Sequence, residues 1–256
     1  MSFCNRIRLA SEKNDSPIVL ALDFAFETPK DRDELFAKAE CVLAAAHPYI
    51  CAVKFNHHLV LPLGAFDGVQ RLIRKAHDLS LPTIMDCKIN DIGDTNQVIA
   101  EYYYAAGFDA VIANPFIGWE EGLRPIFDVA HRLEKAVILL VYMSHKGAAE
   151  GYGQTIIDPS SGEKVLQYVS FARKALKYAA DGVVVGATYS EKIAEVHSIL
   201  GDKVPIFSPG IGAQGGAVEA ALAAGANYLI VGRSIIQTKD PAKAAKTLQK
   251  LVRRQE

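Results

Sequence analysis

Residues Leu81–Asp91, with the sequence LPTIMDCKIND, join a short apolar run to three alternating charges. The apolar run is typical of a buried strand. Side chains two residues apart share one face of a strand, so we expect Asp86 and Lys88 to point the same way and Cys87 to point to the other side. Asp91 lies just beyond the expected strand end, where a loop would return it toward the ammonium of Lys88.

Charges of this kind are costly to bury unless each is paired with an opposite charge. A carboxylate, an ammonium and a second carboxylate at a strand end indicate either a site for chemistry or a structural ion-pair cluster that closes the strand. Structural networks also perturb pKa values, so this stretch alone leaves both interpretations open. The rest of the chain decides between them.

Similar short strand patterns alternate with amphipathic helical patterns along the whole sequence. The expected strands are 18–24, 50–55, 83–88, 110–115, 136–143, 182–186, 205–208 and 228–232. The expected helices are 32–46, 66–79, 95–106, 120–133, 163–180, 190–200, 216–224 and 241–254. Near-continuous apolar strands, each followed by a helix, predict a parallel sheet, and eight such pairs in one chain favour a (β/α)8 barrel, the TIM-barrel α/β fold. No linker divides the chain, so we expect one domain over residues 1–256, with residues 1–16 as a polar N-terminal extension.

Composition excludes several classes of partner. The chain has 256 residues, half of them hydrophobic, and a formal net charge of −1, which predicts neither nucleic-acid nor membrane-surface binding. Its four cysteines form no metal-binding or paired spacing, and neither a signal peptide nor a membrane-spanning run is expected. We therefore expect a cytoplasmic protein whose partner is a small-molecule substrate.

The ends of the expected strands carry polar groups, which bears on the choice left open above. Active sites of TIM barrels lie at the carboxyl ends of the strands. In chain order, these ends carry Asp23, Lys54, Asp86 with Lys88, Asn114, Ser144, Pro209-Gly210 and Gly232-Arg233. Chance charges would scatter over the helices, so this pattern favours a catalytic site.

A glycine-rich loop lies at 208–216, SPGIGAQGG, and contains the spacing G-x-G-x-x-G. As a dinucleotide fingerprint it lacks the acidic residue about 20 positions on, although Arg233 leaves an NADP interpretation open. In many barrels the loops after strands seven and eight instead bind a phosphate monoester through backbone N–H groups. Arg233 would add a bidentate cation, whereas a merely flexible turn would leave Arg233 unexplained.

Three other features have simpler interpretations. Ser144-His145 lacks the surroundings of a nucleophile elbow, and strand neighbours point to opposite faces, so a hydrogen-bonding serine is favoured over a hydrolase dyad. His57-His58 has no third metal ligand at a sensible spacing. The segment 146–161, rich in Gly, Ser and Pro, is expected to be a loop over the site or a disordered excursion.

Together these residues resemble the orotidine 5′-monophosphate decarboxylase family over nearly the whole chain. The matching motifs are Leu20–Asp23, Val53-Lys54, the D-x-K-x-x-D of Asp86, Lys88 and Asp91, Thr95-Asn96, Met143-Ser144-His145, 208–216 and 231–234. D-x-K-x-x-D alone is shared with related sugar-phosphate enzymes, but its combination with Met143-Ser144-His145 and the glycine-rich loop is specific.

The resemblance implies decarboxylation of orotidine 5′-monophosphate to UMP and CO₂, in pyrimidine biosynthesis, with no metal or organic cofactor. The catalytic residues that it implies are Lys88, Asp86, Asp91 and Lys54. The implied substrate-binding residues are Asp23, Ile92, Thr95, Ser144, Pro209, Gly210, Gly212, Gln214, Gly232 and Arg233. Lys88 would stabilise and protonate the C6 carbanion, because no cofactor is present to accept the electrons.

The resemblance also implies a homodimer with shared active sites, in which Asp91, Ile92 and Thr95 serve the neighbouring subunit. Two alternatives remain. One is a Mg²⁺-dependent enzyme similar to 3-keto-gulonate-phosphate decarboxylase, which shares the D-x-K-x-x-D motif. The other is a catalytically silent nucleotide-binding barrel, which would be expected if Asp86 or Lys88 were missing, and both are present.

Overall fold

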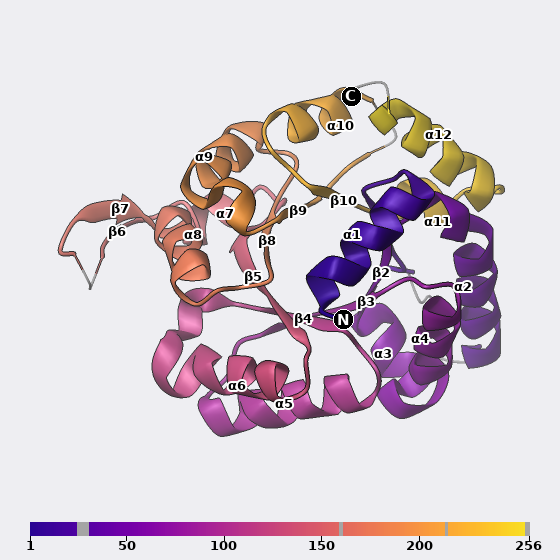
Figure 1. Ribbon diagram of the computed structural model, residues 1–256, viewed down its shortest axis with the longest axis horizontal. Helices are drawn as coiled ribbons and strands as arrows, with labels where there is room; N and C mark the ends of the chain where they lie inside the picture. Colours follow the sequence, from indigo (N-terminus) through magenta and orange to yellow (C-terminus); the bar gives the residue numbers. More distant parts are fainter. Residues whose placement is uncertain (25–30, 159–160, 213–214, 254–256) are drawn as a thin grey trace.

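The computed structural model describes residues 1–24, 31–158, 161–212 and 215–253. Within these residues, eight parallel strands close into a barrel (Figure 1), which confirms the predicted fold. The barrel strands are β1 (Ile18–Ala21), β2 (Ala52–Asn56), β3 (Thr83–Ile89), β4 (Ala110–Ala113), β5 (Ala136–Tyr142), β8 (Gly182–Val185), β9 (Ile206–Pro209) and β10 (Tyr228–Val231). Each strand pairs with its neighbours along the chain, and β10 pairs with β1 to close the ring. All of the predicted strands are present, because a strand buried on both faces leaves a clear apolar run.

Helices surround the barrel and cover the outer face of its strands (Figure 1). The long ones are α2 (Arg32–Ala46), α4 (Val69–Asp78), α5 (Gly93–Ala105), α6 (Arg124–Arg132), α8 (Gln167–Lys177), α9 (Ser190–Leu200), α10 (Gly215–Ala223) and α12 (Pro241–Arg253). Helix α4 illustrates why these helices pack on the barrel. Its apolar residues Val69, Leu72, Ile73 and Ala76 recur on one face and are all buried. Across the described part of the chain, no helix has the length and apolar character needed to cross a membrane.

Three predicted helices, α4, α6 and α8, begin later than expected. Short helical segments between the main elements were also not predicted. These segments are η1 (His47–Tyr49), α3 (His57–Leu63), η2 (Gly64–Gly68), η3 (Pro115–Ile117), η4 (Trp119–Leu123), α7 (Ala148–Gly151), η5 (Gly201–Lys203) and α11 (Arg233–Ile236). The helix expected from residue 66 is interrupted at Asp67, whose φ and ψ are not helical. The helix expected from residue 120 is interrupted at Glu120 and Glu121 for the same reason, so α6 begins at Arg124.

The segment 146–161 was expected to be a loop or a disordered excursion, but it contains strand β6. Residues 164–166 were expected to be helical, but they form strand β7. Strands β6 (Thr155–Ile157) and β7 (Lys164–Leu166) pair as an antiparallel hairpin that projects from the barrel beside α8 (Figure 1). Gly162, in the connection, has a φ of +73°, which glycine adopts at no steric cost and which a helix excludes. Across the hairpin, the β-branched residues Ile156 and Val165 pair directly.

The segment expected to be a polar extension folds as helix α1 (Phe3–Asn14). Its apolar residues Phe3, Ile7 and Ala10 have helical spacing and are buried. The ring of Phe3 stacks on that of Phe207, with centroids 6.5 Å apart. Figure 1 shows α1 lying across the end of the barrel.

A buried carboxylate, Asp109, ties α1 to this end of the barrel. Asp109 immediately precedes β4, and its oxygens lie 2.6 Å from Arg6 of α1 and 2.8 Å from His77 of α4. It also accepts a hydrogen bond from the backbone N–H of Thr83, at 2.8 Å, and lies 3.4 Å from Lys135. Burial by itself would raise the pKa of Asp109, but His77 and Arg6 outweigh it and hold the pKa below its usual range.

Asp109→Asn is therefore expected to destabilise the fold by about 2–3 kcal/mol at pH 7, because the cations lose their buried partner but remain partly hydrated. A lowered pKa gives stability that is present above the unfolded carboxyl's pKa and is lost as the pH falls through the folded pKa. Urea unfolding at several pH values measures both effects. The variant should lose less stability than the parent below about pH 4, and parallel curves would contradict the assignment.

Candidate active site

A cavity of about 800 Å³ opens where the barrel strands end. Apolar side chains, among them Ile112, Leu140, Val184 and Ile230, line it together with polar and charged groups. The charged and polar lining residues are Asp23, Lys54, Asn56, His58, Asp86, Lys88, Ser144, His145, Arg233, Ser234 and Gln237. An apolar enclosure with convergent charges is the usual form of a small-molecule site.

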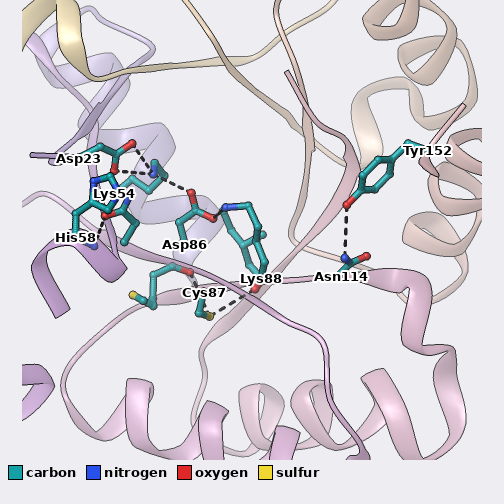
Figure 2. A network of polar contacts seen from close by, with 11 residues as sticks. Asp23, Lys54, His58, Asp86, Cys87, Lys88, Asn114 and Tyr152 are labelled. Atoms are coloured by element: carbon teal, nitrogen blue, oxygen red, sulfur yellow. Dashed lines mark hydrogen bonds and ion pairs between the residues drawn. The ribbon is translucent and has the colours of Figure 1, made fainter. Parts of the chain in front are cut away.

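Four alternating charges run across this cavity (Figure 2). Lys54 Nζ lies 3.1 Å from a carboxylate oxygen of Asp23 and 2.8 Å from one of Asp86. The other Asp86 oxygen lies 2.5 Å from Lys88 Nζ. The contact confirms that Asp86 and Lys88 point the same way, and the order of charges is negative, positive, negative, positive.

The two lysines occupy different environments. The side chain of Lys54 is 4% exposed and touches two carboxylates, whereas that of Lys88 is 40% exposed and touches one. Burial would lower the pKa of Lys54, but Asp86 and Asp23 raise it, so this ammonium stays charged. Burial would raise the pKa of Asp86, but Lys54 and Lys88 lower it, so the carboxylate stays ionised. Lys54 is thus the buried ammonium of the array, and Lys88 is the more exposed one.

The backbone at Lys88 is unusual. Its φ of +49° lies in the left-handed region, which costs energy for a residue with a side chain. The register between β3 and β4 also shifts between Met85 and Ile89. Irregularities of this kind re-aim side chains near active sites. The thiol of the neighbouring Cys87 donates a hydrogen bond to the carbonyl oxygen of Ile112, at 3.5 Å. Burial raises the pKa of this thiol to about 12.

Asp91 does not return to Lys88 of its own chain, contrary to the loop expected from sequence. Asp91, Ile92 and Thr95 are exposed and do not line the cavity. Buried Asn96 fixes this outward loop, because its amide exchanges hydrogen bonds with the backbone N–H and carbonyl of Asp91, at 3.0 and 2.6 Å. Asn114 also turns away, and its amide donates to the hydroxyl of Tyr152 at 3.5 Å (Figure 2).

Ser144 and His145 both line the cavity, so the expectation that they face opposite ways is wrong. Strand β5 ends at Tyr142, and the alternation of a strand does not extend beyond it.

The glycine-rich end of the cavity follows β9 and β10. Pro209, Gly210, Gly212, Gly232 and Arg233 all line it, as the sequence suggested. Gly210 has a φ of +98°, which favours glycine over any other residue. Gln214 lies outside the described residues.

Five polar lining residues were not assigned to the site from the sequence, and these are Asn56, His58, His145, Ser234 and Gln237. Asn56 follows Lys54 by two residues on the same strand, so strand alternation alone identifies it. Gln237 lies one helical turn after Arg233, at the end of a short helix that was not predicted. Among the described residues, no group of three or more His, Cys, Asp or Glu is placed to hold a metal ion, around His58 or elsewhere.

A protein-family model described as the orotidine 5′-phosphate decarboxylase / HUMPS family matches residues 16–248. The match contains every lining residue of the cavity and begins after α1.

Individual relatives agree with this match. The chain is 36% identical to an orotidine 5′-phosphate decarboxylase of Methanosarcina mazei over 228 residues, 89% of this chain and 91% of that protein. A crystal structure of the Pyrococcus horikoshii enzyme of that name superposes with a TM-score of 0.74 at 31% identity, covering 92% of this chain and 99% of that one. The Methanocaldococcus jannaschii enzyme, complexed with the inhibitor BMP, gives a TM-score of 0.73 at 31% identity, with 92% and 97% covered.

Proposed function

The chain belongs to the orotidine 5′-phosphate decarboxylase / HUMPS family, and on that basis we propose that it decarboxylates orotidine 5′-monophosphate to UMP and CO₂. It would be a carboxy-lyase of de novo pyrimidine biosynthesis, acting in the cytoplasm as one barrel domain over residues 1–256 and without a metal or cofactor. The observation that supports this best is the array of Asp23, Lys54, Asp86 and Lys88 across the cavity at the strand ends.

The proposed reaction has two steps. The bond between C6 of the pyrimidine and its carboxylate breaks, CO₂ leaves, and the electron pair remains on C6. Lys88 then transfers a proton from its ammonium to C6, which gives UMP, and a solvent proton restores the ammonium. The position of Lys88 suits both steps, because its side chain reaches the cavity and is held by one oxygen of Asp86, at 2.5 Å.

Electrostatics would lower the barrier. Preorganised charges act strongly where negative charge develops in a site with apolar walls. The Lys88 ammonium would stabilise the C6 carbanion, and the ionised Asp86 would repel the substrate carboxylate beside it. Lys54, held between Asp23 and Asp86, would keep the array in place and its charges balanced.

The remaining lining residues suit the other parts of a nucleotide. We assign Asp23, and Thr95 of the partner subunit, to the ribose hydroxyls and Ser144 to the pyrimidine edge. The proposed phosphate site is Pro209, Gly210, Gly212, Gln214, Gly232 and Arg233. Glycines allow backbone N–H groups to approach phosphate oxygens, and the guanidinium adds a bidentate cation.

The direct test is the loss of absorbance as purified protein decarboxylates orotidine 5′-monophosphate in EDTA. Activity that resists the chelator supports the proposal. Activity only on a 3-keto-sugar phosphate, and only with Mg²⁺, would identify the related sugar-phosphate enzyme. Binding of UMP without turnover would identify a silent barrel.

We also propose a homodimer that shares its active sites. The surface near Asp91 carries exposed apolar side chains, Phe66 (56% exposed), Ile92 (70%), Val98 (45%) and Tyr102 (61%). The rings of Phe66 and Tyr102 touch edge to face, with centroids 6.2 Å apart. A surface of this kind is typical of an interface, and a two-fold axis there would present Asp91 to the partner's cavity.

Mixing two inactive variants, Lys88→Ala and Asp91→Ala, is expected to restore activity once subunits exchange. If Asp91 acts in the neighbouring subunit, a mixed dimer has one site with both defects and one intact site. Random pairing makes about half of the dimers mixed, so about a quarter of parental activity should return.

The matched control mixes Lys88→Ala with Asp86→Ala. These side chains touch within one chain, so every site keeps a defect and no activity should return. If mass spectrometry shows that subunits have exchanged, and the mixture of Lys88→Ala with Asp91→Ala still has no activity, the shared site is ruled out.

A further inference from the structure

The backbone of Ser144 packs directly against Gly186, which follows a different strand. Gly186 follows β8, and a Cβ placed on it would lie 2.5 Å from Cα and 2.8 Å from N of Ser144. Real side chains do not approach so closely, so any larger residue at position 186 must displace Ser144. The N–H of Gly186 also donates to the carbonyl of Tyr142, at 2.9 Å, which ties the two strand ends together.

Tyr189 also contacts the residues on either side of Ser144. Its hydroxyl donates to the carbonyl oxygen of His145, the residue after Ser144, at 3.1 Å. Its ring contacts that of Tyr142 edge to face, with centroids 5.2 Å apart. The N–H of Tyr189 donates to the carbonyl of Gly186, at 3.1 Å, so residues 186–189 form one compact turn.

This turn also touches the glycine-rich end of the cavity. A Cβ on Gly210 would lie 3.2 Å from Cβ of Ser144 and 3.4 Å from Oγ1 of Thr188. The N–H of Ala187 donates to the carbonyl of Pro209, at 2.8 Å. Residues 186–189 therefore form a backing for both Ser144 and the start of the proposed phosphate loop.

We propose that Tyr189 is a positioning residue for base recognition. Its hydrogen bond to His145 fixes the turn that carries Ser144 at the cavity wall, and Gly186 provides the space for that turn. The ligand selected is one with the amide-like edge of a pyrimidine. This inference rests on the proposed function, which assigns Ser144 to that edge.

The test compares two ligands by calorimetry. UMP carries both a base and a phosphate, whereas ribose 5-phosphate carries only the sugar and phosphate. Tyr189→Phe removes one hydroxyl and keeps the ring contact with Tyr142, so it should weaken UMP binding by about threefold to tenfold. Binding of ribose 5-phosphate should be unchanged.

Tyr104→Phe is the matched control. The Tyr104 hydroxyl also donates to a backbone carbonyl, that of Ala136, at 2.9 Å, but at the opposite end of β5. This variant should change thermal stability without changing the affinity for either ligand.

A double-mutant cycle shows whether Tyr189 acts through Ser144. In a Ser144→Ala background, Tyr189→Phe should cause no further loss of UMP affinity. Equal loss in both backgrounds, equal loss for both ligands, or no loss at all would each overturn the positioning role. A second variant, Gly186→Ala, tests the same turn. It should also weaken the binding of UMP more than the binding of ribose 5-phosphate.

Failure of the proposed function is distinguishable from failure of this inference. A parent protein that does not decarboxylate orotidine 5′-monophosphate overturns the function, whichever way the binding comparison falls. A parent that decarboxylates it, but whose Tyr189→Phe variant binds UMP equally well, overturns the positioning role alone.

Discussion

Lys88→Ala is expected to lower kcat by more than about 10³-fold while leaving the fold intact. Removing a single electrostatic stabiliser commonly costs about 10²–10³ in rate, and Lys88 would also supply the proton. The fold should survive because the side chain is partly exposed and touches one partner. Lys88→Arg should also be nearly inactive, since a guanidinium keeps the charge but does not release a proton.

The measurement is steady-state decarboxylation, with circular dichroism to confirm folding. Lys75→Ala is the matched control, because Lys75 is a lysine on α4 as partly exposed as Lys88, with only a 3.9 Å contact to Glu40. It should stay close to the parent. A folded Lys88→Ala protein within tenfold of parental activity would disprove the mechanism.

Arg233→Ala is expected to lower kcat/KM for orotidine 5′-monophosphate by about 10²–10³-fold, since charge-assisted bidentate bonds to phosphate are strong. Part of that binding energy should be used in the transition state, so kcat should fall as well as KM rise. The slow reaction of the nucleoside orotidine, which has no phosphate, should hardly change.

The control is Arg124→Ala, because Arg124 is an exposed arginine that pairs with Glu120 at 3.1 Å on the outside of the barrel. It should leave both reactions unchanged. Similar losses on nucleotide and nucleoside with Arg233→Ala would show that Arg233 does not act through the phosphate.

Local periodicity predicts those parts of the molecule in which one pattern determines one structure. The helices at 32–46 and 190–200 have the predicted bounds, and their ends carry recognisable residues, since the Asp31 side chain caps the start of the first and Gly201 ends the second. The pairing of Asp86 with Lys88 follows from strand alternation, although the left-handed backbone at Lys88 does not. The cavity was predictable because a barrel brings its strand ends together, however distant they are in sequence.

Features that depend on tertiary contacts were not predictable. Helix α1 looks polar because it buries only a narrow apolar stripe around Ile7. The outward direction of Asp91 depends on Asn96, whose role as a buried amide is invisible in the sequence. The hairpin of β6 and β7 is too short to leave a pattern, and its turn depends on Gly162.

The position of α1 also determines how the protein can be handled. Its contacts with Asp109 and with the carbonyl of Asp181 place it against residues that immediately precede β4 and β8, so it covers the floor of the barrel. The cavity opens at the other end of the same strands. A carrier or affinity tag fused ahead of Met1, which is 77% exposed, would therefore project away from the mouth, and immobilisation through it would leave substrate access open.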